Sequence, residues 1–212
     1  MLKQWEEREN FLVTGGSRGY GAVVSNTLRA CGATVYTAQR TISPSDWEED
    51  RQKFKEGFWK CDFEHAEAVI PLVQKFVKSK EKISGVVHMV ALRETKNPKL
   101  LNTFDLVKHL QANVLNPLML TVYLYQYGAM CSRSPVIWLL DRCKYPDELL
   151  EYTISKSSLP QIVGPILEKL TDLRNVYIIA PPSSQPGSDD IVSNAVVNVF
   201  SRENTAQVID LR

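Results

Sequence analysis

A glycine-rich segment near the start of the chain reads Thr14-Gly15-Gly16-Ser17-Arg18-Gly19-Tyr20-Gly21. It begins at the end of a β-rich run over residues 10–14 and precedes a helical pattern over residues 22–31. Glycines in such a turn permit positive φ and let the backbone and the helix N-terminus approach a pyrophosphate. An ordinary strand-to-helix turn is the alternative. Because the segment heads a β-α-β unit, we expect it to bind a dinucleotide.

Further β-rich runs alternate with segments in which apolar residues recur at helical spacing. The predicted strands cover residues 10–14, 33–38, 57–61, 85–90, 135–140, 175–179 and 207–211, and helical spacing is found over residues 69–77, 107–114 and 162–170. This alternation implies right-handed crossovers and a parallel sheet with helices on both faces. We expect one α/β domain over residues 1–212, a doubly wound Rossmann-type sheet of about seven strands.

The composition is that of one compact globular domain: 212 residues, 44% hydrophobic and 23% charged. It excludes disordered, collagen-like and disulfide-scaffold classes. Lys and Arg number 25 against 24 Asp and Glu, a net charge of +1, and no apolar run is long enough to span a bilayer. We therefore expect a small-molecule ligand rather than nucleic acid or membrane.

Cysteine usage and the charged N-terminus point to a reducing compartment. The four cysteines, Cys31, Cys61, Cys131 and Cys143, lie far apart without a CxxC pair. The first nine residues carry too many charges for the apolar core of a signal peptide. A cytoplasmic location is the expectation.

The end of the second predicted strand indicates which dinucleotide is bound. It reads Thr37-Ala-Gln-Arg40-Thr41, with no acidic residue until Asp46. A carboxylate here would hold a ribose 2′-hydroxyl, whereas a cation accommodates a 2′-phosphate. Arg18 and Arg40 together are suited to clamp a phosphate, although each alone could be a solvated surface charge. The pair favours NADP(H) over NAD(H).

Two residues four apart on a predicted helix, Tyr152 and Lys156, fall on one helical face. A nearby ammonium favours a phenolate and makes the tyrosine a usable proton donor and acceptor. The alternative is that both side chains are exposed to solvent and have no functional role.

Asn113 is a third candidate. Pro117, four residues later, has no N–H to donate to the carbonyl of Asn113, so that carbonyl is left to bind water. The alternative is that Asn113 only satisfies the hydrogen bonding at a local break in the helix.

With these residues the chain resembles the classical short-chain dehydrogenase/reductase family along nearly its whole length. The resemblance rests on Thr14-Gly15-x-x-x-Gly19-x-Gly21, Asp62, Asn113 and Tyr152-x-x-x-Lys156. It implies pyrophosphate binding, an adenine contact at Asp62, a proton-relay water at Asn113, a proton donor at Tyr152 and a nicotinamide-ribose contact at Lys156. The expected cofactor contacts are Gly15, Ser17, Arg18, Gly19, Tyr20, Gly21, Arg40, Asp62, Ala91, Tyr152 and Lys156.

Three positions depart from the family pattern. The serine that precedes the tyrosine is replaced by Asp141, similar to the pteridine reductase branch, and Asp141 is expected to anchor substrate or to pair with a neighbouring cation. The Asn-Asn-Ala-Gly motif reads His88-Met-Val-Ala91, in which we interpret His88 as a core residue. The interval from Pro181 through Pro182 to residue 190 is too short for the usual substrate lid.

The leading hypothesis is an NADPH-dependent reductase of a carbonyl or pterin-like substrate, with Tyr152 as proton donor. A dinucleotide-binding sensor or partner subunit with weakened turnover is the alternative, favoured by the three departures. Self-association as a homodimer or homotetramer is also expected. The helix over residues 106–127 carries more apolar surface than one face needs, including Leu118, Met119, Val122, Tyr123 and Tyr125.

Overall fold

The computed structural model describes residues 9–41, 57–94, 101–130, 133–140, 149–173, 175–181 and 187–201, and the backbone of residues 208–210. Five residues considered above lie outside the described residues: Asp46, Cys131, Asp141, Cys143 and Pro182.

The described strands form a single parallel sheet. They are β1 (Asn10–Thr14), β2 (Thr34–Gln39), β3 (Phe58–Lys60), β4 (Gly85–His88), β5 (Val136–Leu139), β6 (Val176–Ala180) and β7 (Val208–Asp210). Their order across the seven-stranded sheet is β3-β2-β1-β4-β5-β6-β7. The chain changes direction across the sheet between β1 and β4, which makes this the switch point where such folds bind ligands. The predicted fold class is confirmed.

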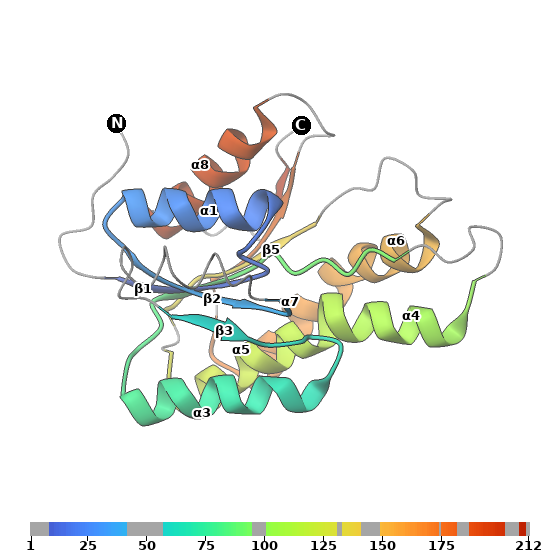
Figure 1. Ribbon diagram of the computed structural model, residues 1–212, viewed down its shortest axis with the longest axis horizontal. Coiled ribbons are helices and arrows are strands. Elements are labelled where there is room, and N and C mark those ends of the chain that lie inside the picture. Colours follow the sequence, from blue (N-terminus) through green and yellow to red (C-terminus); the bar gives the residue numbers. More distant parts are fainter. Residues whose placement is uncertain are drawn as a thin grey trace.

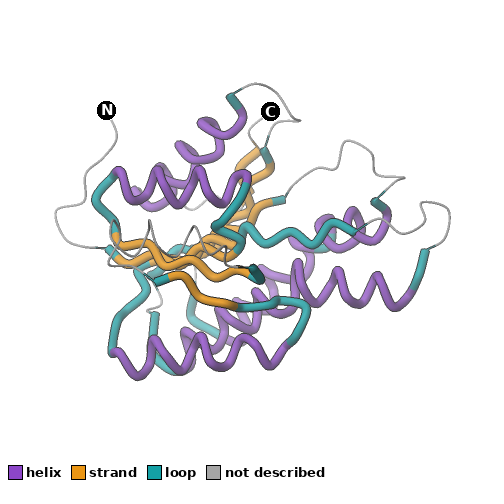
Figure 2. Tube along the Cα trace, viewed as in Figure 1, coloured by secondary structure: helices purple, strands orange, loops and turns teal. Residues whose placement is uncertain are grey.

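Helices cover both faces of the sheet (Figure 1). They are α1 (Gly19–Ala30), α3 (Val69–Ser79), α4 (Thr103–Leu110), α5 (Asn116–Gln126), α6 (Leu150–Ser157), α7 (Leu159–Leu170) and α8 (Ser188–Ser201). Helices α1 and α8 lie on one face, and α3, α5 and α7 lie on the other, while α4 packs against α6 (Figures 1 and 2). A short 3-10 turn, η1 (Ala66–Ala68), precedes α3.

Alternation of side chains along the strands divides the core into two layers. Leu12 and Val86 join the cluster under α3, α5 and α7, whereas Val13 and Val87 join the cluster under α1 and α8. Strands covered on both faces need apolar residues at consecutive positions, which explains why the β-rich runs are nearly continuous.

His88 is a core residue, as the sequence indicated. Its ring is 1% exposed, lies 4.1 Å from the Trp138 ring, and makes contacts at 3.3 Å with the Thr14 hydroxyl and 2.7 Å with the Thr121 hydroxyl. Burial, with the Lys156 charge adding, lowers the pKa of His88 to about 3. The imidazole is therefore neutral at physiological pH and faces the core rather than a ligand.

The helix that carries Asn113 widens before Pro117. A π-helical turn, η2 (Gln111–Leu115), joins α4 to α5, and the N–H of Asn116 bonds to the carbonyl of Gln111 five residues earlier. Proline cannot complete the α-helical bond to residue 113, so the wider turn is the local response.

Helix α5 exposes fewer apolar side chains than the sequence indicated for the helix over residues 106–127. Leu118 and Val122 are each 2% exposed and lie in the core cluster under α3 and α7. The expectation that these two side chains are surplus was wrong, because α5 also packs against α3 and α7. Met119, Tyr123 and Tyr125 are half-buried.

None of the described helices combines the length and the apolar character needed to cross a lipid bilayer. Cys31 and Cys61 are buried free thiols. Burial, with the Asp62 charge adding, raises the pKa of Cys61 to about 12, so this thiol is protonated and weakly nucleophilic although it borders the cavity described below.

Candidate active site

The glycine loop between β1 and α1 leaves no room for a side chain at Gly15 or Gly21, where a Cβ would meet backbone atoms. Gly15 has a φ of +71°, and a Cβ there would come within 2.9 Å of the backbone of Met89 and Val90. A Cβ on Gly21 would lie 2.1 Å from the carbonyl oxygen of Gly15. The N–H of Gly15 also bonds to the carbonyl of Ala38 at 2.7 Å. The loop is thereby held against the ends of β2 and β4.

A cavity of about 610 Å³ lies beyond the carboxyl ends of the strands, beside this loop. Its lining comes from the loop, the end of β2, residues 61–64 after β3, residues 89–94 after β4, and Ala112, Leu139 and Asp189. Nine of the predicted cofactor contacts line it together: Gly15, Ser17, Arg18, Gly19, Tyr20, Gly21, Arg40, Asp62 and Ala91. The position matches the switch point of the sheet.

The loop end of the cavity is suited to phosphate. Helix α1 starts at Gly19 with no acidic residue in its first turn, so its N-terminal N–H groups meet no carboxylate from their own helix. Arg18 occupies the N-cap position in an extended conformation and is exposed. The Tyr20 hydroxyl donates to the Ser188 hydroxyl at 3.2 Å, which ties the first turn of α1 to the start of α8. The residues present therefore fit a pyrophosphate.

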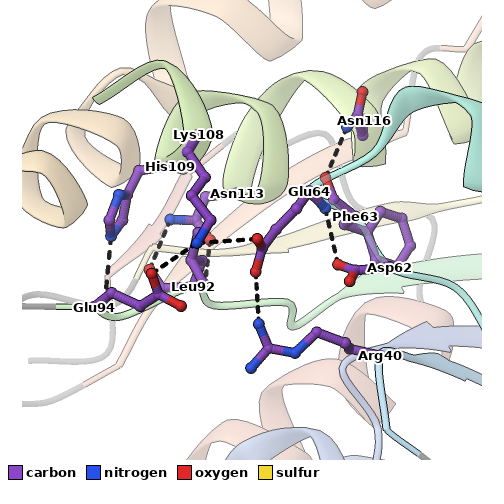
Figure 3. Close-up of polar contacts among 10 residues, drawn as sticks. All are labelled: Arg40, Asp62, Phe63, Glu64, Leu92, Glu94, Lys108, His109, Asn113 and Asn116. Carbon is purple, nitrogen blue, oxygen red and sulfur yellow. Dashed lines mark hydrogen bonds and ion pairs between the residues drawn. The ribbon is translucent and has the colours of Figure 1, made fainter. Parts of the chain in front are cut away.

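Arg40 has a carboxylate partner that the sequence reading did not foresee. One of its terminal nitrogens lies 2.6 Å from the Glu64 carboxylate (Figure 3). The expectation that no acid competes near Arg40 was wrong, because it considered only the segment after β2. Glu64 comes from the segment after β3, which pairs with β2 in the sheet. Arg40 is 51% exposed and still borders the cavity.

Residues 61–64 form one wall of the cavity. The Asp62 carboxylate accepts from the N–H of Glu64 at 3.1 Å, and Asn116 on α5 donates to the carbonyl of Phe63 at 2.7 Å (Figure 3). These bonds fix a short turn after β3 with Asp62 half-buried at the cavity wall.

Asn113 joins the helix break to the strand-end segment after β4. Its side-chain oxygen accepts from the N–H of Leu92 at 2.6 Å, and its amide nitrogen donates to the carbonyl of Leu92 at 3.2 Å and to the Ser155 hydroxyl at 3.0 Å. The side chain therefore does not cap the break at Pro117. It holds the segment Val90–Arg93 and links that segment to α6, the helix of Tyr152 and Lys156.

Lys156 contacts the same segment from its other end. Its ammonium donates to the carbonyl of Val90 at 2.9 Å and to the carbonyl of Leu139 at 3.4 Å. Tyr152 is fully buried, and the guanidinium of Arg93 lies 4.9 Å from its ring centre. The structure thus gathers Asn113, Tyr152 and Lys156 behind cavity-lining residues. None of the three is itself among the described residues that line the cavity.

The Lys156 ammonium is destabilised by its surroundings. Burial, with the charge of Arg93 adding, lowers its pKa to about 7 from the ordinary 10.5. Near neutral pH the side chain therefore exists in both its charged and neutral forms and can exchange a proton with a neighbouring group.

This pKa makes a prediction about stability. Between about pH 7 and 10.5 the unfolded chain keeps the lysine proton and the folded chain does not, so raising the pH through this window stabilises the fold. The free energy of unfolding of the wild type, minus that of Lys156→Met, should rise by on the order of 3 kcal/mol across the window. Urea unfolding of both proteins from pH 6.5 to 10 measures this difference. A flat difference would contradict the buried, uncharged lysine.

Several residues at the site were missed from the sequence. Arg93, Glu94 and Glu64 line the cavity, and Lys108 on α4 contacts both glutamates. Glu64 had a usable signal, since it stands two residues after the expected adenine contact. The described residues contain no cluster of three or more His, Cys, Asp or Glu side chains placed to hold a metal ion.

Comparison with known proteins agrees with this geometry. A family model described as short chain dehydrogenase matches residues 9–134. No characterised protein matches the sequence. Among solved structures, a metagenomic short-chain oxidoreductase in complex with NADP has a TM-score of 0.78 at 18% identity, covering 96% of both chains.

Two further structures share the fold. The Pseudomonas aeruginosa RhlG/NADP complex has a TM-score of 0.76 at 16% identity, covering 96% of this chain and 94% of that one. A Brucella ovis short-chain oxidoreductase with partially ordered NAD has a TM-score of 0.75 at 18% identity, covering 97% of this chain and all of that one, 100%. Relatives of this fold therefore bind either dinucleotide.

Proposed function

Because the chain belongs to the short-chain dehydrogenase/reductase family, we propose that it is an NADPH-dependent oxidoreductase that reduces a carbonyl or pterin-like C=N carbon. The observation that supports this most is the meeting of two groups of residues at one cavity. The glycine loop, Arg18 and Arg40 form its phosphate side, and Asn113, Tyr152 and Lys156 contact the lining residues that follow β4.

Each residue has a proposed role. The N–H groups at the start of α1 hold the pyrophosphate, Arg18 and Arg40 hold the 2′-phosphate, and Asp62 contacts the adenine.

When bound, the dinucleotide supplies the hydride. Tyr152 gives a proton to the substrate oxygen or nitrogen, and Lys156 orients the ribose and supports the charge of the phenolate. The carbonyl of Asn113 holds the relay water, Ala91 borders the nicotinamide, and Asp141 anchors the substrate.

A second candidate is a dinucleotide-binding sensor or partner subunit with little turnover. The burial of Tyr152 favours it, together with the engagement of the Lys156 ammonium by the Val90 and Leu139 carbonyls. The two candidates share the cofactor and differ in turnover, so NADPH oxidation with a panel of ketones, quinones and pterins separates them.

We also propose that the protein acts as a homodimer or homotetramer in the cytoplasm.

Cofactor preference tests the phosphate side of the proposal. NADPH should bind more tightly than NADH, and Arg40→Ala should weaken NADPH binding roughly tenfold while changing NADH binding little, since each charge-assisted contact contributes on the order of 1.5 to 3 kcal/mol. Calorimetric titration of both proteins with both dinucleotides measures this.

Arg18→Ala is expected to weaken binding of both dinucleotides, because Arg18 stands at the N-cap of α1, beside the N–H groups that we propose hold the pyrophosphate. Equal affinities of the wild type for NADPH and NADH would overturn the assignment of NADP(H).

A further inference from the structure

Four charged side chains from four segments form a chain of ion pairs (Figure 3). Three of them, Arg40, Glu64 and Glu94, line the cavity. Glu64 lies 2.6 Å from Arg40 and 3.1 Å from Lys108, and Lys108 lies 2.7 Å from Glu94. Arg40 follows β2, Glu64 follows β3, Glu94 follows β4 and Lys108 belongs to α4. Glu64 is the member that both cations share.

Glu64 is held in this position. Its side chain is 14% exposed, against 51% for Arg40, and its backbone N–H is fixed by the Asp62 carboxylate at 3.1 Å. A largely buried carboxylate is screened less by solvent than one in an exposed surface ion pair, so it is a stronger partner for a cation. Arg40 is therefore drawn to Glu64 at the place where a 2′-phosphate would need it.

We propose that Glu64 is a specificity-determining residue that weakens NADPH binding and so narrows the preference of the site for NADPH over NADH. The inference rests on the proposed function, in which Arg40 holds the 2′-phosphate. Glu64 and the phosphate are both anions that seek the same guanidinium, and their charges repel each other. The 2′-hydroxyl of NADH carries no charge, so Glu64 opposes NADPH alone.

Lys108 moderates this effect through Glu64. The hydrogen bond from Lys108 to Glu94, with Glu64 adding, raises the pKa of the ammonium, so Lys108 is charged at neutral pH. Its charge partly offsets that of Glu64, and it contacts the second carboxylate oxygen while Arg40 contacts the first. Removing Lys108 should leave Glu64 more strongly engaged with Arg40 and more repulsive to a 2′-phosphate.

The test is calorimetric titration of the full chain with NADPH and with NADH. Glu64→Gln, which keeps the shape and removes the charge, should bind NADPH about tenfold more tightly and change NADH binding less than about twofold. The control is Glu67→Gln, the same charge change at an exposed residue of η1 outside the cavity lining. Its affinities for both dinucleotides should match those of the wild type.

A double-mutant cycle tests the route through Glu64. Lys108→Met should weaken NADPH binding several-fold in the wild type and much less in the Glu64→Gln background, because the carboxylate through which it acts is gone. An equal loss in both backgrounds would overturn the coupling.

Titration distinguishes a wrong role for Glu64 from a wrong cofactor assignment. If Arg40→Ala weakens NADPH binding and Glu64→Gln leaves it unchanged, only the role of Glu64 is overturned. If the wild type binds neither dinucleotide, the role of Glu64 and the proposed function are both overturned.

Discussion

Tyr152→Phe is expected to lower kcat for carbonyl reduction by about a hundredfold or more, because general acid catalysis contributes roughly 10²- to 10⁴-fold and phenylalanine has no proton to give. NADPH affinity should change little, since the variant loses only a hydroxyl. Burial of Tyr152 at 0% exposure means that the aromatic ring, which phenylalanine keeps, is needed for packing. NADPH oxidation under saturating substrate measures the rate.

The matched control is Tyr123→Phe. This tyrosine is half-buried on α5 with its ring near that of Tyr127, 6.2 Å between ring centres, and it lies outside the cavity lining. Its loss of a hydroxyl should leave kcat within about twofold of the wild type. Thermal unfolding of both variants shows whether the fold is retained. Wild-type turnover by Tyr152→Phe would remove Tyr152 from the proton-donor role.

Gly21→Ala is expected to abolish measurable dinucleotide binding and to destabilise the fold by about 3 kcal/mol or more. A Cβ on Gly21 would lie 2.1 Å from the carbonyl oxygen of Gly15, a backbone atom that cannot turn away as a side chain can. Relief of the contact requires the loop or α1 to move off the ends of the strands. The melting temperature and the affinity for NADPH should fall together.

Gly19→Ala separates crowding from backbone strain. Gly19 has a φ of +52°, but a Cβ there would meet nothing within 4 Å. Alanine should cost about 1 kcal/mol for the left-handed conformation and leave the loop in place. Equal damage from the two variants would show that crowding at Gly21 is not what requires glycine there.

The fold followed from the sequence because each segment carried its own signal. The β-rich runs at residues 10–14, 85–90 and 175–179 each became a strand within two residues of the predicted ends, and the strand-to-helix turn at Gly15 fell where expected. Local patterns report strands and turns well when a parallel sheet is buried on both faces, since its strands must be continuously apolar. The order of the strands was not predictable in this way, because right-handed crossovers allow more than one doubly wound order.

Features that depend on contacts between distant segments were harder to foresee. Glu64 and Lys108 are 44 positions apart in number, and only the fold brings them within 3.1 Å. The same holds for Leu118 and Val122, whose burial depends on the neighbouring helices that pack against α5. Spacing placed Tyr152 and Lys156 on one helical face, but it carried no information about the Val90 carbonyl that the lysine contacts.

Transfer of deuterium from labelled NADPH to a product tests the central claim most directly. The wild type is incubated with NADPH that carries deuterium at the transferable position of the nicotinamide, and with ketones, quinones and pterins in turn. Mass spectrometry of the products should show deuterium on the reduced carbon of at least one substrate, and Tyr152→Phe should slow its appearance by about a hundredfold. Tight NADPH binding with no deuterium in any product would contradict the reductase and leave the dinucleotide-binding sensor as the function.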